Sequence, residues 1–221
     1  MTNSFKIKFL VRSRLAIPTK TIHSFCTRKV AQLNDARIRN ALLRKLERQK
    51  SAPRAVLEEL HVHNGQAIAD VVTLHKEAHC YEIKGETDRI ERILVQGIYY
   101  NRSFRRITLV TVDSRIERAL KLAPRFWGLM VAYIDGEVVR FRHVRASKLN
   151  PNFDKHSAAL TLWKSEMLEL VAEPGAERKP RRQLAQMIAD RNREFQLSIR
   201  ISDQLLGRQE SLRNSHVTPC R

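Results

Sequence analysis

Cysteine is scarce in this sequence, with three among 221 residues. Cys26, Cys80 and Cys220 lie far apart, and they form neither a Cys-X-X-Cys pair nor any of the usual zinc-ligand spacings. A structural zinc site is therefore not expected. An odd number of isolated cysteines also does not suggest a disulfide framework, and it fits the reducing environment of a cytoplasmic protein.

Long hydrophobic runs are also missing. No apolar run approaches the roughly 18 residues that a membrane-spanning helix needs, so we expect no membrane partner. The apolar residues 9–11 are followed by Arg12 and Arg14, which cuts short any signal-peptide hydrophobic region. Residues 1–34 contain no Asp or Glu, a composition shared by organelle transit peptides and by basic arms that lie on nucleic acid. The sequence favours a basic N-terminal arm at residues 1–32.

Acidic residues are few beside basic ones. The chain has 23 Asp and Glu against 41 Lys and Arg, for a formal net charge of +18. Such a charge says nothing about the fold, but it argues for a polyanionic partner. DNA is the first candidate and RNA an alternative, because lysine and arginine contacts to phosphate release counterions. A membrane surface is disfavoured, since no basic amphipathic helix with exposed aromatics stands out. A homodimer is an open alternative.

Residues 56–84 form the most informative stretch, and their pattern predicts three short strands joined by tight turns. Asn64-Gly65 is a strong hairpin signal, because both residues tolerate the positive φ that a type I′ turn needs. Residues 56–63 and 66–75 on either side are rich in β-branched and apolar side chains. A second turn at residues 76–79 leads into a third strand at residues 80–84.

The charged residues of this meander are unusual for a purely structural sheet. Asp70 interrupts an apolar run, and Glu82 and Lys84 are two residues apart, so both point to the same face of a strand. A hairpin between the second and third strands can bring Asp70 near Glu82. Close carboxylates repel each other, and a hard cation such as Mg²⁺ or Mn²⁺ removes that cost. The simpler alternatives are a turn residue at Asp70 and an ordinary ion pair between Glu82 and Lys84.

An Asp followed, one hairpin later, by Glu-X-Lys resembles the PD-(D/E)XK nuclease superfamily. The proline that names the motif is replaced by Ala69 here. The resemblance implies that Asp70 and Glu82 bind the metal, that the Ile83 carbonyl adds a ligand, and that Lys84 positions the attacking water or steadies charge at the phosphate. It also implies an upstream acidic ligand, for which Glu59 is the better candidate and Glu58 and Glu47 are alternatives.

The following segment extends the resemblance. Residues 87–88 are expected to cap a helix that runs to about residue 101, with an apolar stripe of Ile90, Ile93, Leu94 and Ile98. Gln96 and Tyr100 are four apart and share a face of that helix. Gln-X-X-X-Tyr after Glu-X-Lys is similar to the RecB-like branch of the superfamily and to the CRISPR adaptation exonucleases. In that branch the glutamine helps to orient the lysine or water and the tyrosine contacts the substrate. Residues 82–89 also resemble a largely uncharacterised bacterial family, and the resemblance as a whole covers about residues 33–145.

The remaining pattern predicts an α/β fold in which helices flank a restriction-endonuclease-like mixed sheet. A helix is expected from residue 34 or 35 to 49, strands at residues 107–112, 127–134 and 138–144, and a helix at 116–122. Residues 80–112 form a strand, helix and strand, so their two strands should be parallel. We assign the nuclease-like domain to residues 33–149. Residues 150–221 form a basic helical extension, with helices at 157–172, from the basic stretch 178–182 to about 193 and at 194–206, and a frayed end at 207–221.

The sequence thus predicts a magnesium-dependent deoxyribonuclease, in DNA repair, mobile-element biology or phage defence. Two alternatives remain: a non-catalytic DNA-binding protein on the same fold, and an RNA-binding or protein-binding module. Four histidines near the hairpins, His61, His63, His75 and His79, could indicate a transition-metal site, although rim positions on the sheet are the simpler expectation. The basic residues could also be solvated surface charges. The arginines expected to hold phosphates are Arg89, Arg92, Arg102, Arg105, Arg106, Arg181 and Arg182.

Overall fold

The computed structural model describes residues 32–215, and within that range the chain forms one mixed sheet with the strand order β1-β2-β3-β4-β5-β6. Neighbouring strands are antiparallel except for the β3–β4 and β4–β5 pairs, which are parallel. The mixed sheet and the parallel crossover predicted from the sequence are thereby confirmed. The strands are β1 (Ala55–Val62), β2 (Ala67–Leu74), β3 (Ala78–Lys84), β4 (Arg106–Val112), β5 (Gly128–Asp135) and β6 (Val138–Arg145).

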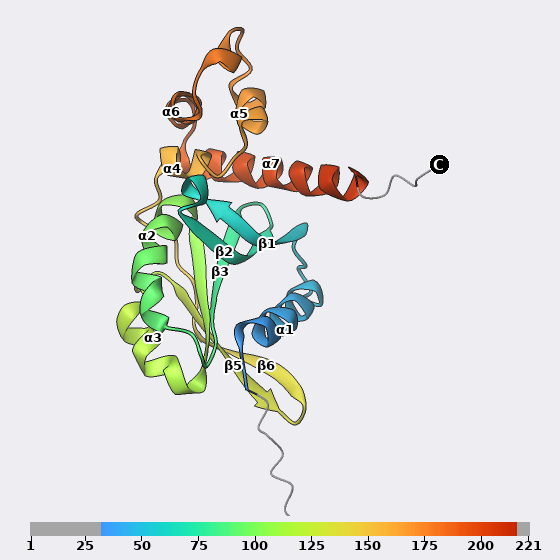
Figure 1. The fold of residues 1–221 in the computed structure, drawn as a ribbon, viewed down its shortest axis with the longest axis vertical. Helices are drawn as coiled ribbons and strands as arrows, with labels where there is room; N and C mark the ends of the chain where they lie inside the picture. The colour runs from blue at the N-terminus through green and yellow to red at the C-terminus, as the bar shows by residue number, and fades with distance from the viewer. Residues whose placement is uncertain (1–31, 216–221) are drawn as a thin grey trace, which may run out of the picture. The chain divides into compact units, whose positions relative to one another are not determined.

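Helices cover both faces of this sheet. Figure 1 shows α2 and α3 on one face and α1 on the other. Two buried apolar clusters follow this division, since one joins Ile93 and Tyr100 of α2 to the sheet and the other joins Ile38 and Leu42 of α1 to its opposite face. The helices are α1 (Asp35–Glu47), α2 (Ile93–Ser103), α3 (Ile116–Leu122), α4 (Lys155–Ala159), α5 (Lys164–Val171), α6 (Arg181–Arg191) and α7 (Glu194–Ser215).

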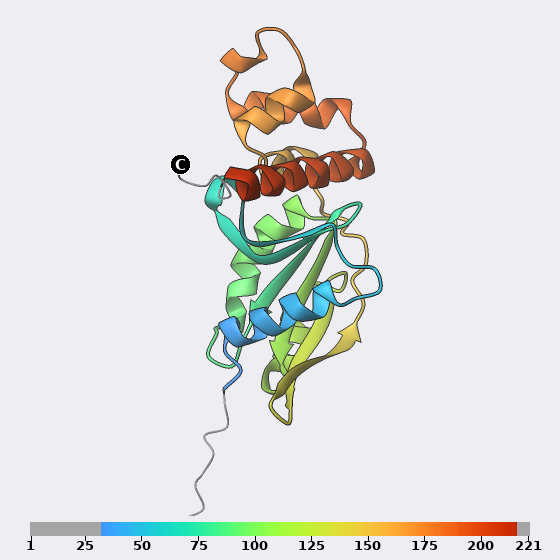
Figure 2. The ribbon, with the colours of Figure 1, turned by 90° about the vertical axis from the view of Figure 1, so that its right-hand side faces the viewer.

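The C-terminal helical extension is confirmed, and it packs against the sheet. Helix α7 contacts β1, β2 and β3, and it lies across one end of the sheet (Figure 2). Leu197 and Leu205 of α7 belong to the same buried cluster as Tyr100. No helix within residues 32–215 is long and apolar enough to cross a membrane.

Helix α1 begins where the sequence predicts. The Asn34 side chain caps it by accepting a hydrogen bond from the backbone N–H of Arg37. The segment before the helix crosses the end of β3, where Gly85 lets the two backbones meet. A Cβ on Gly85 would lie 2.7 Å from the backbone oxygen of Leu33. This close approach places the N-terminus of α1 directly beside Lys84.

The β1–β2 and β5–β6 hairpins form, but the first turn differs from the prediction. Between β1 and β2 the connection is four residues, 63–66, because Val62 already pairs with Ala67. His63, Asn64 and Gly65 all take positive φ, of 49°, 58° and 82°. The second turn has Gly136 and Glu137 at its centre, since Asp135 pairs with Val138. Asp135 is thus the last strand residue and lies outside the centre of the turn.

The segment leading into α2 differs more from the prediction. Asp88 does not cap a helix, because its Oδ2 accepts a hydrogen bond from the Gly85 N–H, and a short 3₁₀ turn at Ile90–Arg92 precedes α2. The buried positions on α2 are Ile93, Gly97, Tyr100 and Ser103. Leu94 and Ile98 are each 52% exposed, so the predicted apolar stripe is wrong at these two residues. Tertiary packing explains this difference. The Trp127 ring lies 3.2 Å from the position that a Cβ on Gly97 would take, so the face of α2 that carries Gly97 packs against the sheet.

The predicted boundaries in the extension also need correction. The single helix expected at residues 157–172 is two helices, α4 and α5, because Trp163 takes an extended conformation and begins a new helix. Helix α6 starts at Arg181, inside the basic stretch 178–182 and directly after Pro180. Residues 207–215, expected to be frayed, belong to α7. The predicted arm at residues 1–31 and the last residues, 216–221, lie outside the described part of the chain.

Candidate active site

Strands β2 and β3 separate at Asp70, and this split defines the candidate site. Their backbone pairing ends with Val71 opposite Tyr81. One residue further, the Oδ2 atom of Asp70 accepts a hydrogen bond of 2.7 Å from the Ile83 N–H. Ile68 O, left without a partner on β3, accepts a hydrogen bond of 2.6 Å from the Tyr100 hydroxyl. The Asp70 carboxylate therefore occupies the gap between the strands.

An irregularity in β1 and β2 creates this gap. Side chains on one face of a regular strand are two residues apart. In β1 and β2, the residues that join the buried cluster under α2 are three apart at one point. These are Leu57 and Leu60 in β1, and Ala69 and Val72 in β2. The register on either side places Glu59 opposite Asp70. Glu59 also has a φ of 52°, a conformation that L-residues rarely adopt. The alternation of side chains thus shifts by one residue in both strands at the same level, and this shift brings the Asp70 carboxylate into the split.

Glu82 and Lys84 complete the centre of the site. Both side chains are buried, with Glu82 0% and Lys84 5% exposed. The Lys84 ammonium donates to Glu82 Oε1 and, over 3.2 Å, to the carbonyl oxygen of Ile83. It therefore contacts the two groups on β3 that the nuclease resemblance assigns to the metal ion. The predicted convergence of Asp70, Glu82, Ile83 and Lys84 is present.

The electrostatics of the centre indicate a shortage of positive charge. Burial, and then the Asp70 charge, raise the pKa of Glu82 to about 7. Burial also raises the pKa of Asp70, although the Ile83 N–H and the Lys84 charge oppose that shift. The Oε2 atom of Glu82 is buried and has no hydrogen-bond partner within the described residues. A buried carboxylate with a free oxygen can accept a further cation or donor.

Arg39 of α1 is a site residue that the sequence reasoning missed. Its guanidinium lies 2.9 Å from Asp35 Oδ2, 2.9 Å from Glu59 Oε1 and 3.7 Å from Asp70 Oδ1. Helical periodicity alone would place Arg39 on the polar face of α1, away from Ile38 and Leu42. The one available signal was its position four residues after Asp35, a spacing that favours an ion pair on a helix.

Glu59, the expected third acidic ligand, is held by Arg39 and its side chain is 67% exposed. No group of three or more His, Cys, Asp or Glu side chains within residues 32–215 is arranged to hold a metal ion. A metal ion at the split would therefore rely on Asp70, Glu82, the Ile83 carbonyl and water. The Arg39 guanidinium contacts both Glu59 and Asp70 and thereby links the two carboxylates.

The residues at the split fit a hard divalent cation. Carboxylate and carbonyl oxygens are preferred ligands of Mg²⁺, which usually keeps several of its waters. Among the described residues, four carboxylates, those of Asp35, Glu59, Asp70 and Glu82, pair with two cationic side chains, Arg39 and Lys84. The difference of four and two leaves a formal charge of −2, which one divalent ion balances. Such an ion would compete with Lys84 for Glu82 and the Ile83 carbonyl.

Gln96 and Tyr100 lie on the face of α2 that covers the split. Gln96 Nε2 lies 3.5 Å from the Tyr100 hydroxyl, and Gln96 Oε1 is buried without a hydrogen-bond partner within the described residues. Tyr100 is 0% exposed and its hydroxyl donates a hydrogen bond to Ile68 O, so the ring cannot contact a substrate as the resemblance implies. Burial and the Glu82 charge raise the pKa of Tyr100. Its position indicates that it holds β2 in its split conformation.

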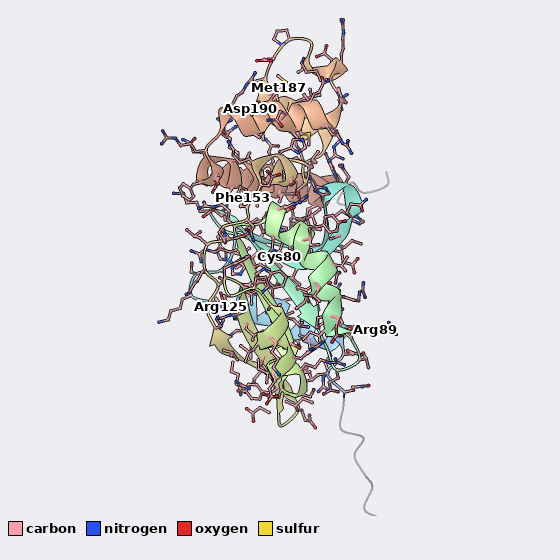
Figure 3. The ribbon with its side chains drawn as sticks, turned by 90° about the vertical axis from the view of Figure 1, so that its left-hand side faces the viewer. Cys80, Arg89, Arg125, Phe153, Met187 and Asp190 are labelled. Atoms are coloured by element: carbon pink, nitrogen blue, oxygen red, sulfur yellow. The ribbon has the colours of Figure 1, made fainter. Side chains whose placement is uncertain are left out.

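The arginines predicted to bind phosphate divide into two groups. Arg89, Arg92, Arg102 and Arg182 are exposed, and Figure 3 shows Arg89 at the outer side of the segment before α2. The other three serve the fold. Arg105 pairs with Glu77 at 2.7 Å, Arg106 donates to Ser147 O, and Arg181 donates to Asn64 Oδ1 and to the carbonyls of Leu160 and Leu162. Sequence gives no sign of such long-range acceptors.

The histidines near the hairpins do not converge on a metal site within the described residues. His61 is exposed, and His63 packs against the Tyr99 ring. His79 departs from the expected rim position, because it stacks on Tyr81 at a centroid distance of 4.5 Å and its Nε2 lies 2.8 Å from Thr108 Oγ1. Burial lowers the pKa of His79 to about 3.

The half-buried His79 should make the protein sensitive to acid. Its folded-state pKa of about 3 lies below the value of 6.5 in the unfolded chain, so stability falls as the pH drops below 6.5. At pH 4.5 this one group should remove about 2 to 3 kcal/mol of unfolding free energy. Urea unfolding at pH 7 and pH 4.5 measures the free energy of unfolding that each protein loses between these values. We expect the loss in a His79→Gln variant to be about 2 to 3 kcal/mol smaller than the loss in the wild type. His61→Gln serves as the exposed control. An equal loss in wild type and His79→Gln would contradict the prediction.

Comparison with known proteins gives a family. A search of curated proteins found no match, and neither did a search of solved structures. A family model described as Bacteriophage P4 protein cII matches residues 28–211, which include the whole sheet and most of the helical extension. The chain therefore belongs to the bacteriophage P4 protein cII family.

Proposed function

We propose that this protein is a metal-dependent phosphodiester hydrolase that acts on DNA, with a site of the PD-(D/E)XK type. One observation carries the proposal: Asp70 and Glu82 converge where β2 and β3 separate, and the Lys84 ammonium binds Glu82 and the Ile83 carbonyl there. The net charge of +18 supports a polyanionic substrate. The family is described by the name of a bacteriophage protein, which supports a role in mobile-element or phage biology in the cytoplasm.

The side chains at the split would divide the chemistry among them. Asp70, Glu82 and the Ile83 carbonyl would hold Mg²⁺ or Mn²⁺. The bound ion supplies positive charge for the phosphate and a water of lowered pKa. Lys84, once released from Glu82, would donate to a phosphate oxygen or orient the attacking water. The free Oε1 atom of Gln96 is an acceptor for a proton of that water.

A second function is favoured by the burial of the same residues. Glu82 is completely enclosed and Lys84 nearly so, and a phosphate must reach them for hydrolysis to occur. A protein that keeps this arrangement closed would bind DNA without cleaving it. This candidate predicts salt-sensitive DNA binding that needs neither metal nor Lys84.

The deciding experiment is a cleavage assay on end-labelled single-stranded and double-stranded DNA with Mg²⁺, with Mn²⁺ and with EDTA. We expect metal-dependent cleavage that falls by at least about 1,000-fold in Asp70→Asn, because the neutral amide removes a ligand charge. Asp190→Asn is the matched control, since Asp190 is exposed on α6 (Figure 3) and accepts a hydrogen bond from the neighbouring Gln186 side chain. Equal cleavage by all three proteins would refute the assignment. No cleavage by the wild type, with salt-sensitive binding retained, would support the second function.

A further inference from the structure

A second candidate site lies on the α1 face of the sheet, away from the split. Helix α1 and the β5–β6 hairpin enclose a groove with a volume of about 370 Å³. Figure 2 shows α1 crossing this face of the sheet, with the hairpin beside it. Cationic side chains line both walls, and no acidic side chain lines the groove. They are Arg44, Lys45 and Arg48 from α1 and Arg140 from β6.

The three cations at the C-terminal end of α1 have no structural task within the described residues. Ile38, Leu42 and Leu46 turn the apolar side of α1 toward the sheet, which leaves Arg44, Lys45 and Arg48 along the groove. None of these three forms an ion pair or side-chain hydrogen bond with any residue between 32 and 215. Their position near the helix C-terminus is mildly favourable, by about 0.3 to 1 kcal/mol each. Arg140 of β6 also lines the groove, but it pairs with Asp135 at 2.6 Å, so the three cations at the end of α1 supply the unpaired charge.

The floor of the groove is partly aromatic. Phe141 of β6, which packs against the cluster under α1, and Tyr133 of β5 both line the groove and are half-buried. Cationic walls bind a phosphate backbone, and aromatic rings between them offer surfaces on which unpaired bases stack. Bases in a duplex are already stacked on one another and are not available for such contacts. The combination therefore favours a single strand over a duplex.

We propose that the groove formed by Arg44, Lys45, Arg48 and Arg140 around Tyr133 and Phe141 binds single-stranded DNA. The inference rests on the proposed function only in taking DNA as the polyanion, and it needs no metal ion. The groove and the split share helix α1. Arg44 follows Arg39 by five residues, which is about 7.5 Å along the helix axis. A strand in the groove thus lies on the helix whose other end contacts Asp70.

The test measures binding of a labelled oligothymidine by fluorescence anisotropy in EDTA, so that metal binding and cleavage play no part. The variant carries Arg44→Gln, Lys45→Gln and Arg48→Gln, changes that preserve helix propensity. A control variant carries Arg178→Gln, Lys179→Gln and Arg193→Gln, which remove the same charge from the C-terminal extension.

We expect the groove variant to bind about 100-fold more weakly at 0.1 M salt, since each lost phosphate contact costs about five-fold there. Its slope of log K against log salt should be shallower by about 2. The control variant should stay within about three-fold of the wild type. Thermal unfolding of both variants checks that they fold.

Three results would overturn the proposal. Equal losses in the two variants would mean that the overall charge binds the strand. A wild-type preference for duplex DNA of the same length would contradict the single-stranded occupant. Tighter binding of an RNA of equal length, in direct competition, would assign the groove to RNA. Absence of nuclease activity would leave all of these measurements interpretable, so the two proposals can fail separately.

Discussion

Replacing Lys84 by methionine should reduce Mg²⁺-dependent cleavage by about 100- to 10,000-fold and yet tighten the binding of Mn²⁺. The two effects have one cause. The ammonium of Lys84 binds Glu82 and the Ile83 carbonyl, the groups that would hold the metal ion. Without it both oxygens are free, and a positive charge that repels the incoming cation is gone. The same change removes the group that would act on the water or the phosphate.

The metal-free Lys84→Met protein should also be less stable than the wild type. Glu82 would keep its burial but lose its only cationic partner, and breaking a buried pair from one side typically costs about 3 to 5 kcal/mol. Saturating Mn²⁺ should restore most of that loss, because the ion replaces the missing charge. Thermal unfolding in EDTA and in Mn²⁺ measures both effects.

Calorimetric titration with Mn²⁺ completes this test, with Lys121→Met as the control because Lys121 is an exposed lysine on α3. The control should match the wild type in cleavage, stability and affinity. Weaker Mn²⁺ binding by Lys84→Met would show that Lys84 does not compete with the metal. Unchanged cleavage would remove Lys84 from the chemistry.

Replacing Glu82 by glutamine should remove a pH dependence from the stability of the metal-free protein. The pKa of Glu82 is about 7 in the folded protein and 4.5 in the unfolded chain, so the unfolded chain ionises first as the pH rises. Wild-type stability therefore falls between pH 4.5 and 7 and loses nothing further from this group above that range. Glutamine does not ionise, so the variant should lack this fall of about 3 kcal/mol, while at every pH it leaves the buried Lys84 ammonium without its carboxylate partner.

The same variant should lose its response to metal. Mn²⁺ at 100 times its dissociation constant stabilises a folded protein by about 2.7 kcal/mol, and Glu82→Gln should show almost none of this. Urea unfolding at pH 5 and pH 8, with EDTA or with Mn²⁺, gives both quantities. Glu117→Gln is the control, because Glu117 is exposed on α3. If Mn²⁺ stabilised Glu82→Gln as much as the wild type, Glu82 would not be a ligand.

The central part of the site could be predicted because it depends on local geometry. Glu82 and Lys84 share a face of β3 by strand alternation alone, and the Asn64-Gly65 turn sets the hairpin that starts β2. The shift in side-chain alternation at Glu59 and Asp70 could not be predicted. A residue with positive φ in mid-strand is favoured only by its surroundings, here the Arg39 guanidinium that binds both carboxylates.

The surface was predicted less well, for a physical reason. An arginine can bind an acceptor far away in sequence, as Arg181 binds Asn64 and Arg105 binds Glu77, and the sequence does not show which acceptor lies within reach. Conversely, Arg44, Lys45 and Arg48 read as an ordinary solvated face of a helix. Only the β5–β6 hairpin beside them turns that face into the wall of a groove.

By itself, the sequence determined the mixed α/β sheet, the helical extension and the order of Asp70, Glu82 and Lys84 along it, because strand and helix periodicity are local properties. The tertiary structure decided three further points. It enclosed Glu82 and Lys84, assigned some arginines to the fold, and left the cations of α1 facing a groove. These outcomes depend on which segments pack together, and such packing places charges from distant parts of the chain within a few ångströms of each other.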